Sequence, residues 1–225
     1  AIGDVHGCFA ELLALERRII ADATGVAGEK WIVTLGDYID RGPASAQVVD
    51  HLMAPPPADF RRICLLGNHE QMLLDFLAAP RANPYLLEYG GWETAQSYGL
   101  NTSAGINLTG LARDLRGRMP PEHLQWLEQL PIALSVPGYI FAHAGIRPGL
   151  TLDEQSDQDL LWIRQPFLDS LASQAGTIVV HGHTPVAEPE QTAARINVDT
   201  GCFATGRLTA VRIDAGGGVS FLFNR

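Results

Sequence analysis

Five short polar motifs, each at the end of an apolar run, hold most of the residues in this chain that could do chemistry. They contain five of the seven histidines, together with aspartates and an asparagine, which are ligands for hard or borderline metal ions. The set is large enough for two metal ions and leaves an acid and a cation for chemistry. In chain order the motifs are Gly3-Asp4-Val5-His6-Gly7, Gly36-Asp37-Tyr38-Ile39-Asp40-Arg41-Gly42, Gly67-Asn68-His69-Glu70, His143-Ala144-Gly145 and His181-Gly182-His183-Thr184-Pro185.

Asp37 is the residue that two metal ions could share. Its carboxylate has two oxygens, so it can bridge cations about 3.5–4 Å apart, the usual two-metal spacing. In Asp4-x-His6 the side chains emerge from a turn, where a carboxylate and an imidazole can grip one face of an ion. The amide oxygen of Asn68 is a neutral hard ligand.

Each motif also has a structural explanation when it is considered alone. Asp4 and Asn68 could satisfy the free N–H groups at the start of a helix. Asp40 and Arg41 could be a solvated turn pair, which contributes little to stability. A single histidine such as His143 is more often structural than a ligand. All of these explanations together require five polar clusters at strand ends by accident, so we favour the functional interpretation.

The elements that position the motifs alternate between strands and helices in the first half of the chain. Such repetition predicts βαβ crossovers and a largely parallel sheet, in which ligands gather beyond the carboxyl ends of the strands. The first three motifs lie at such ends. We expect strands at 1–2, 31–35 and 62–66, and helices at 9–21, 44–53 and 70–78.

The rest of the chain completes a single domain over residues 1–225. Residues 85–130 read as helices that form a cap-like insertion, with an uncharged loop over 99–110. The second half is richer in strands, which predicts two packed sheets flanked by helices, and the glycines of 215–218 predict a hairpin connection. The strands are expected at 132–136, 139–142, 177–180, 195–198, 208–213 and 219–223.

Composition restricts the class of protein. Hydrophobic residues make up 46% and charged residues 18%, as in ordinary globular proteins. The net charge of −9 without a lysine or arginine cluster argues against nucleic-acid or anionic-membrane binding. No apolar stretch reaches the length of a membrane span. Cys8, Cys64 and Cys202 form no CxxC pair, so we expect buried reduced thiols and a cytoplasmic protein. Because the chain opens almost inside its first motif, we expect residues before Ala1.

The order of the motifs resembles that of metallophosphoesterases of the phosphoprotein serine/threonine phosphatase type, the calcineurin-like phosphoesterases, and especially their compact bacterial members. The resemblance runs from Gly3 to about Thr205. It implies an α/β fold, namely a four-layer α/β/β/α sandwich of two mixed β-sheets flanked by helices. It also implies a dinuclear metal site at the carboxyl ends of the strands.

The resemblance assigns roles to individual residues. Asp4 and His6 would hold one metal, Asp37 would bridge, and the second would be completed by Asn68, His143 and His183. His183 is preferred to His181 because the family's Gly-His-Thr-Pro places the ligand directly after glycine. Two divalent ions are implied, with Mn²⁺ expected and iron or zinc also suited to these ligands.

The resemblance also implies the reaction, which is hydrolysis of a phosphomonoester by a metal-bridging hydroxide. Arg41 and Arg164, together with Asn68, would bind the phosphoryl group. His69 would protonate the leaving group and Asp40 would orient His69.

The substrate is the open question. Leu66 stands where eukaryotic protein phosphatases usually have arginine, and their long C-terminal substrate-groove segments have no counterpart here. Related symmetrical bis(5'-nucleosyl)-tetraphosphatases typically carry Gly-Asn-His-Asp and lack the full Asp-Arg-Gly pattern, so Glu70 and Asp40-Arg41-Gly42 favour the serine/threonine phosphatase branch. We therefore expect a phosphorylated protein or a small phosphoester as substrate. The alternatives are a dinucleoside polyphosphate and, from another class, a catalytically silent metal-binding protein.

Overall fold

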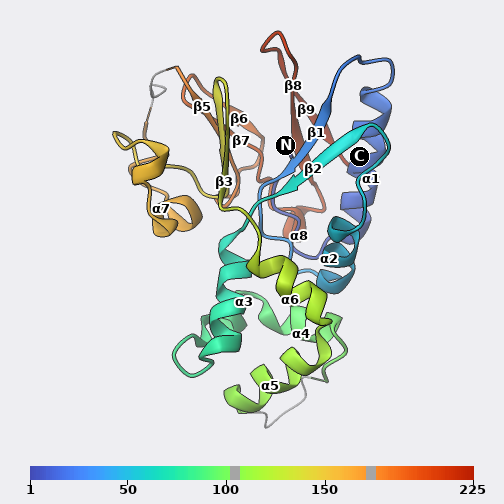
Figure 1. The fold of residues 1–225 in the computed structure, drawn as a ribbon, viewed down its shortest axis with the longest axis vertical. Coiled ribbons are helices and arrows are strands. Elements are labelled where there is room, and N and C mark those ends of the chain that lie inside the picture. The colour runs from blue at the N-terminus through green and yellow to red at the C-terminus, as the bar shows by residue number, and fades with distance from the viewer. Residues whose placement is uncertain (102–106, 171–175) are drawn as a thin grey trace.

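Two β-sheets pack face to face in the computed structural model, with helices against both outer faces (Figure 1). The structure describes residues 1–101, 107–170 and 176–225. The layers follow the expected α/β/β/α order. Helix α1 (Phe9–Asp22) flanks the first sheet and helix α7 (Asp157–Trp162) flanks the second, at opposite sides of Figure 1.

The first sheet consists of two strand pairs joined by the start of the chain. Strands β1 (Lys30–Thr34) and β2 (Phe60–Cys64) are parallel, as the βαβ pattern predicts. Strands β8 (Thr209–Ile213) and β9 (Val219–Phe223) form an antiparallel hairpin. Ile2 lies between β1 and β8, because its N–H donates to Val33 O at 2.8 Å and it bridges Ala210 antiparallel.

The second sheet has the order β3-β4-β5-β7-β6. Its central strands β4, β5 and β7 are parallel, and the outer strands pair antiparallel, so the sheet is mixed. The strands are β3 (Ala133–Val136), β4 (Tyr139–Ala142), β5 (Ile178–His181), β6 (Glu190–Gln191) and β7 (Arg195–Asn197).

The helices α2 to α6 gather beyond one end of the first sheet, where Figure 1 shows them below the strands. The described helices are α1 (Phe9–Asp22), α2 (Ser45–Met53), α3 (Asn68–Ala78), α4 (Gly91–Ser97), α5 (Leu108–Arg118), α6 (Pro121–Glu128), α7 (Asp157–Trp162) and α8 (Cys202–Thr205), with 3-10 turns η1 (Pro84–Tyr89) and η2 (Leu152–Glu154).

Three apolar clusters correspond to the interfaces between these layers. The middle cluster joins the two sheets and includes Val33 from β1, Phe141 from β4 and Val211 from β8. The largest cluster lies under α1 to α6, and the third packs α7 on the second sheet. Burial of these faces removes apolar surface from water, which is the main force that holds the layers together.

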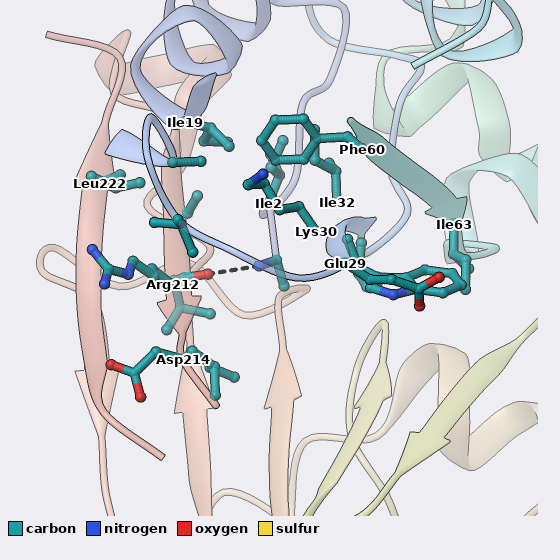
Figure 2. Close-up of a pocket in the computed structure, with 18 of the residues that line it drawn as sticks. Ile2, Ile19, Glu29, Lys30, Ile32, Phe60, Ile63, Arg212, Asp214 and Leu222 are labelled. Carbon is teal, nitrogen blue, oxygen red and sulfur yellow. Dashed lines mark hydrogen bonds between the residues drawn. The ribbon is translucent and has the colours of Figure 1, made fainter. Parts of the chain in front are cut away.

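An apolar groove of about 460 Å³ lies at the amino end of β1 (Figure 2). Ile19, Ile32 and Phe60 line it, and the Ala1 ammonium donates to Val211 O at 2.7 Å beside it. Since the polar motifs follow the carboxyl ends of the strands, this groove is separate from the site that they form.

Most predicted elements are found within one or two residues of their expected bounds. Three differences stand out. Helix α3 begins at Asn68, two residues before the prediction, Gly110 lies inside α5, and the short strand β6 was not predicted. Part of the predicted 99–110 loop falls outside the described residues. The three cysteines are free and buried, as expected. Among the helices of the described chain, none is long and apolar enough to cross a membrane.

Candidate metal centre and active site

The carboxyl ends of the strands bring the motifs into one place, although 179 positions separate the first from the last along the chain. Asp4 follows the Ile2 segment, and Asp37 follows β1 through a tight Gly36 turn. Gly36 has a φ of 100°, and a Cβ there would collide with the backbone of Gly67, so the two loops touch. The residues gathered there are Asp4, His6, Asp37, Asp40, Arg41, Asn68, His69, His143 and His183.

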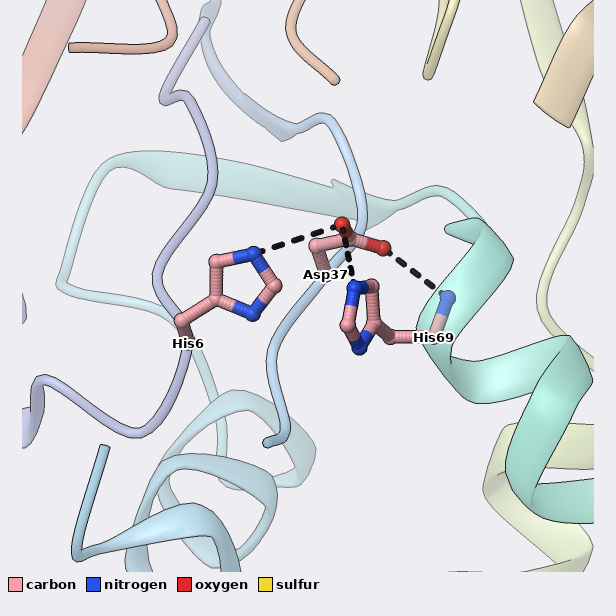
Figure 3. A group of neighbouring side chains, drawn as sticks. All are labelled: His6, Asp37 and His69. Atoms are coloured by element: carbon pink, nitrogen blue, oxygen red, sulfur yellow. Dashed lines mark hydrogen bonds and ion pairs between the residues drawn. The ribbon is translucent and has the colours of Figure 1, made fainter. Parts of the chain in front are cut away.

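Asp37 lies between two groups of possible metal ligands. Its Oδ2 is 3.4 Å from His6 Nε2, and its Oδ1 is 3.4 Å from His143 Nε2. The ligand atoms of His6, Asp37 and His69 lie within 4.8 Å of one another, and so do those of Asp37, His143 and His183. Figure 3 shows the first group around the carboxylate. Asp37 thus offers one oxygen to each group, as a bridging ligand must.

The second group has its lone pairs aimed at one point. His143 Nδ1 lies 2.9 Å from Leu35 O, a carbonyl that can only accept, so this nitrogen carries the proton. The Nε2 of the neutral ring is then a lone pair, and it faces Asn68 Oδ1 at 2.7 Å. His183 Nδ1 approaches the same oxygen at 2.9 Å. Two acceptors, His143 Nε2 and Asn68 Oδ1, thus face each other, and a cation is their natural partner, so these residues fit a metal ion.

The first group has the same orientation of its imidazoles. His6 Nδ1 donates to Ile39 O at 2.8 Å, which leaves its Nε2 lone pair toward Asp37. The Arg41 guanidinium donates to His6 Nε2 at 3.0 Å, and it lies 3.1 Å from His69 Nε2. A guanidinium has no acceptor and His6 Nδ1 already carries the proton, so His6 Nε2 is a lone pair that faces a positive charge.

The electrostatics of the site keep most of its histidines neutral. Burial lowers the pKa of His6 and of His183 to about 3, and it also lowers the pKa of His143. Burial alone would raise the pKa of Asp37, but His143 and the other surrounding imidazoles hold it well below its usual value. Neutral imidazoles and an ionised carboxylate are the forms that bind a metal.

Asp4 lies at the edge of these groups. Its carboxylate accepts the backbone N–H of His183 at 3.1 Å and lies against Gly182, where a Cβ would collide with it. Burial and the charges of Asp199 and Asp37 raise the pKa of Asp4 well above its usual value. His69, and not Asp4, completes the tight cluster around His6, so the ligand role of Asp4 remains a prediction.

His69 belongs to a buried hydrogen-bonded chain. Its Nδ1 is 2.7 Å from Asp40 Oδ2, and Thr94 of α4 donates to Asp40 Oδ1. Burial lowers the pKa of His69, but Asp37 and Asp40 outweigh it, so the net shift is upward. The protonated form is thus favoured at this histidine, in contrast to His6 and His183.

Glu70 anchors the loop that carries Asp37, a role that the sequence did not reveal. Its Oε2 accepts the N–H groups of Asp37 at 2.8 Å and Gly67 at 3.0 Å. Its Oε1 accepts those of Tyr38 at 2.8 Å and Ile39 at 3.3 Å. The only signal was its position as the third residue of helix α3, where a glutamate commonly binds free N–H groups.

Other side chains at the site were missed as well. Thr94 comes from α4, and Asp199 lies beside Asp4 after strand β7. Asp199 follows a strand, so the strand-end pattern could have found it. His181 is fully buried, and its Nδ1 lies 3.0 Å from Gly182 O.

Arg164 is the least engaged of the predicted residues. It is exposed directly after α7 and its neighbour Ile163. Burial is the main cause of the low pKa of His183, and the charges of His143 and Arg164 add to it. The charge of Arg164 thus reaches His183 of the second ligand group.

A sequence model of the family described as calcineurin-like phosphoesterase matches residues 1–204. The asymmetrical bis(5'-nucleosyl)-tetraphosphatase PrpE of Anoxybacillus flavithermus is 26% identical over 94% of this chain and 88% of its own length. Serine/threonine-protein phosphatase 1 of Salmonella typhimurium is 29% identical over 94% of this chain and 90% of its own length.

Solved structures share the fold. A crystal structure with the provisional name of a diadenosine tetraphosphatase matches with a TM-score of 0.64 and 22% identity, covering 99% of this chain and 91% of that one. A cold-active protein-tyrosine phosphatase of a Shewanella species matches with a TM-score of 0.54 and 19% identity, covering 98% and 78%.

Proposed function

The chain belongs to the calcineurin-like phosphoesterase family, which makes it a hydrolase of phosphoric ester bonds, and we propose that it is a two-metal phosphomonoesterase. One observation carries the proposal. The two oxygens of Asp37 face two separate groups of converging ligand atoms. Two divalent ions bound there would lower the pKa of water, and so supply a nucleophile near neutral pH, and would offset the charge of the phosphoryl group. Mn²⁺ is our first candidate, since the ligands are oxygen and imidazole without thiolate.

The side chains of the chain would hold the metal ions and bind the phosphoryl group. Asp4, His6, Asp37, Asn68, His143 and His183 form the proposed ligand set. Arg41 lies 3.0 Å from His6 Nε2, so its guanidinium reaches the centre and can donate to the phosphoryl oxygens through charge-assisted bonds.

His69 is the proposed proton donor to the leaving oxygen. Its hydrogen bond to Asp40 and its raised pKa support a proton on this ring. Asp40 is itself held by Thr94, so the acid has a fixed orientation. Arg164 is the proposed second phosphate-binding residue, and its exposed place beside His183 is compatible with contact to a substrate.

Phosphorylated serine or threonine is our first candidate substrate. It is supported by the 29% identity to a relative named serine/threonine-protein phosphatase 1 and by the intact Asp40-Arg41-Gly42 sequence. We also propose that the protein is cytoplasmic and binds neither a nucleic acid nor a membrane. A bis(5'-nucleosyl)-tetraphosphate is the second candidate, because several relatives of 25–29% identity are named for its asymmetrical hydrolysis.

The test of the reaction compares the wild-type protein with Asp37→Asn. We expect the wild type to bind two Mn²⁺ per chain in equilibrium dialysis and to hydrolyse p-nitrophenyl phosphate. Asp37→Asn keeps the shape of the side chain but loses one of the shared oxygens and the charge, so both bound metal and turnover should fall. Full turnover in the variant would refute the bridging role.

The test of the substrate compares a phosphoserine peptide with diadenosine tetraphosphate on the Mn²⁺-loaded protein. Faster release of phosphate from the peptide supports the first candidate. Faster cleavage of the dinucleotide supports the second, and its products separate symmetrical cleavage, which gives ADP alone, from asymmetrical cleavage, which gives ATP and AMP.

A further inference from the structure

Two exposed aromatic rings stand beside the metal centre and have no part in the reaction proposed above. Phe203 is 41% exposed and Tyr89 is 49% exposed, whereas most large apolar side chains of the chain are buried. Exposed apolar side chains scattered singly over a surface need no explanation. These two differ because each contacts a histidine of the site.

Phe203 touches the phosphate-binding side of the site. It lies on α8, and its ring is 5.4 Å from the His6 ring at an interplanar angle of 85°. The Arg41 guanidinium lies over the same ring, 4.6 Å from its centroid, at the distance of a cation–π contact. Phe203 therefore borders the position where Arg41 would hold a phosphoryl group.

Tyr89 lies on the side of the proposed acid. It is the last residue of η1, and its ring is 6.4 Å from the His69 ring at 90°. The next residue, Gly90, accepts the Arg41 N–H at 3.1 Å, and a Cβ on Gly90 would collide with Arg41. This backbone contact holds Tyr89 close to Arg41 in the chain's fold, and the His69 ring that Tyr89 borders lies 3.1 Å from the Arg41 guanidinium, which Phe203 contacts directly.

We propose that Tyr89 and Phe203 form an aromatic subsite that binds a planar ring carried by the substrate beside its phosphoryl group. The ring is either a nucleobase or the phenol ring of a phosphotyrosine. The inference rests on the proposed phosphoesterase reaction and goes beyond it, because it names a structural feature of the substrate. A phosphoserine side chain has no ring, so the subsite disfavours the first candidate substrate.

The physical basis is stacking on rings that are already exposed and held in place. Each contact removes apolar surface of both partners from water, and every nucleobase or phenol has a face that can stack. Tyr89 lies close to the residue that would protonate the leaving oxygen, so a ring attached near that oxygen is within its reach.

The experiment removes one ring at a time from the full-length, Mn²⁺-loaded protein. The variants are Tyr89→Ala, Phe203→Ala and Phe203→Leu, the last of which keeps an apolar side chain without a ring. Tyr85→Ala is the matched control, because Tyr85 is 57% exposed on the same 3-10 turn. The readout is the ratio of kcat/KM for ring-bearing and ring-free substrates, namely diadenosine tetraphosphate and a phosphotyrosine peptide, each against the same peptide with phosphoserine.

We expect the ratio to fall about fivefold to tenfold for each ring removed, at the low end of the range for base stacking on an aromatic side chain. Tyr85→Ala should leave the ratio unchanged. A fall for the dinucleotide alone identifies a nucleobase subsite, and a fall for the phosphotyrosine peptide alone identifies a phenol subsite. An equal fall with all substrates would overturn the proposal, since the rings would then only support His6 and Arg41.

A binding measurement keeps this inference separate from the proposed function. If the wild type cleaves none of these substrates, the proposed function fails, and calorimetric titration with AMP and with inorganic phosphate still tests the subsite. The subsite predicts that AMP binds more tightly than phosphate and that Tyr89→Ala removes the difference. Equal binding of AMP and phosphate by the wild type would refute a nucleobase subsite, and phosphotyrosine against phosphoserine gives the same test for the phenol.

Discussion

Replacing His69 by asparagine should slow the hydrolysis of alkyl phosphates far more than that of aryl phosphates. The His69 ring shares a 2.7 Å hydrogen bond with Asp40. Burial lowers the pKa of His69, but the charges of Asp37 and Asp40 outweigh burial, so the net shift is upward and favours the protonated ring. The second proton of this form would lie on Nε2, which is 3.8 Å from Asp37 Oδ2, in the carboxylate that the two metals would share.

The size of the effect follows from what asparagine cannot do. Asparagine keeps a polar group in the cavity but cannot transfer a proton near neutral pH, so the whole general-acid contribution is lost. That contribution is typically about 10²–10⁴ in rate, or about 3–5 kcal/mol of barrier. An alkoxide needs the proton to depart, whereas a nitrophenolate is stable without it and should depart at nearly the wild-type rate.

The assay measures kcat for a series of phosphate monoesters whose leaving groups differ in pKa. The wild type should depend weakly on the leaving group, and His69→Asn steeply. The wild-type rate on alkyl esters should fall as pH rises through the pKa of His69, and this fall should vanish in the variant. His51→Asn is the control, since His51 pairs with Glu16 at 2.6 Å outside the site.

Two results would refute the reasoning. Equal slowing of alkyl and aryl esters would show that His69 does not donate the proton. Loss of bound Mn²⁺ in His69→Asn would show that this residue is a metal ligand, which the tight cluster of His6, Asp37 and His69 makes a real alternative.

Three further predictions concern the support and the protonation of the metal ligands. Glu70→Gln should lower the free energy of unfolding by about 2–6 kcal/mol in a denaturant titration, because two of the four buried N–H groups lose their acceptor; a loss below about 1 kcal/mol would contradict this. Gly182→Ala should weaken Mn²⁺ binding about 10–100-fold in a chelator competition, because the new Cβ would displace the Asp4 carboxylate, and unchanged affinity would exclude Asp4 as a ligand. Since burial lowers the pKa of His6 and His183 to about 3, both stay neutral at pH 5, and their titration should not weaken Mn²⁺ binding between pH 7 and pH 5; a drop of about 25-fold per ion, as one histidine of pKa near 6.5 at each ion would give, would show that they titrate normally.

The sequence predicted the meeting point of the motifs because a simple rule governs it. Carboxyl ends of parallel strands lie at one edge of a sheet, and polar residues directly after apolar runs must lie there. Asp37 after β1 and Asn68 after β2 are examples, and the parallel pairing of β1 and β2 places them side by side. Strand bounds differed by one or two residues, which does not change the edge at which a motif lies.

The same rule could not find side chains that reach the site from helices. Thr94 lies in the middle of α4 and holds Asp40, but nothing in the Gly91–Ser97 sequence distinguishes it from an ordinary helical threonine. Its role depends on how α4 packs on α2, which is a tertiary contact between segments about 50 residues apart. Phe203 was missed for a related reason, because an exposed phenylalanine in a four-residue helix carries no local signal.

Backbone conformation identifies the site independently of any resemblance in sequence. A positive φ strains a residue that has a Cβ, and in the described chain this conformation occurs at six residues other than glycine, five of which belong to the site. Such strain costs about 1–3 kcal/mol per residue and persists only where the surroundings hold it. Here the surroundings are the Glu70 carboxylate, which accepts three consecutive N–H groups from Asp37 onward, and the Ser45 and Thr94 hydroxyls at the Asp40 N–H. These backbone conformations lower the stability of the fold, and they direct the side chains toward a common centre. This favours a functional origin of the cluster over an accident of packing. The five strained residues are His6 (44°), Asp37 (54°), Asp40 (69°), Arg41 (66°) and His183 (62°).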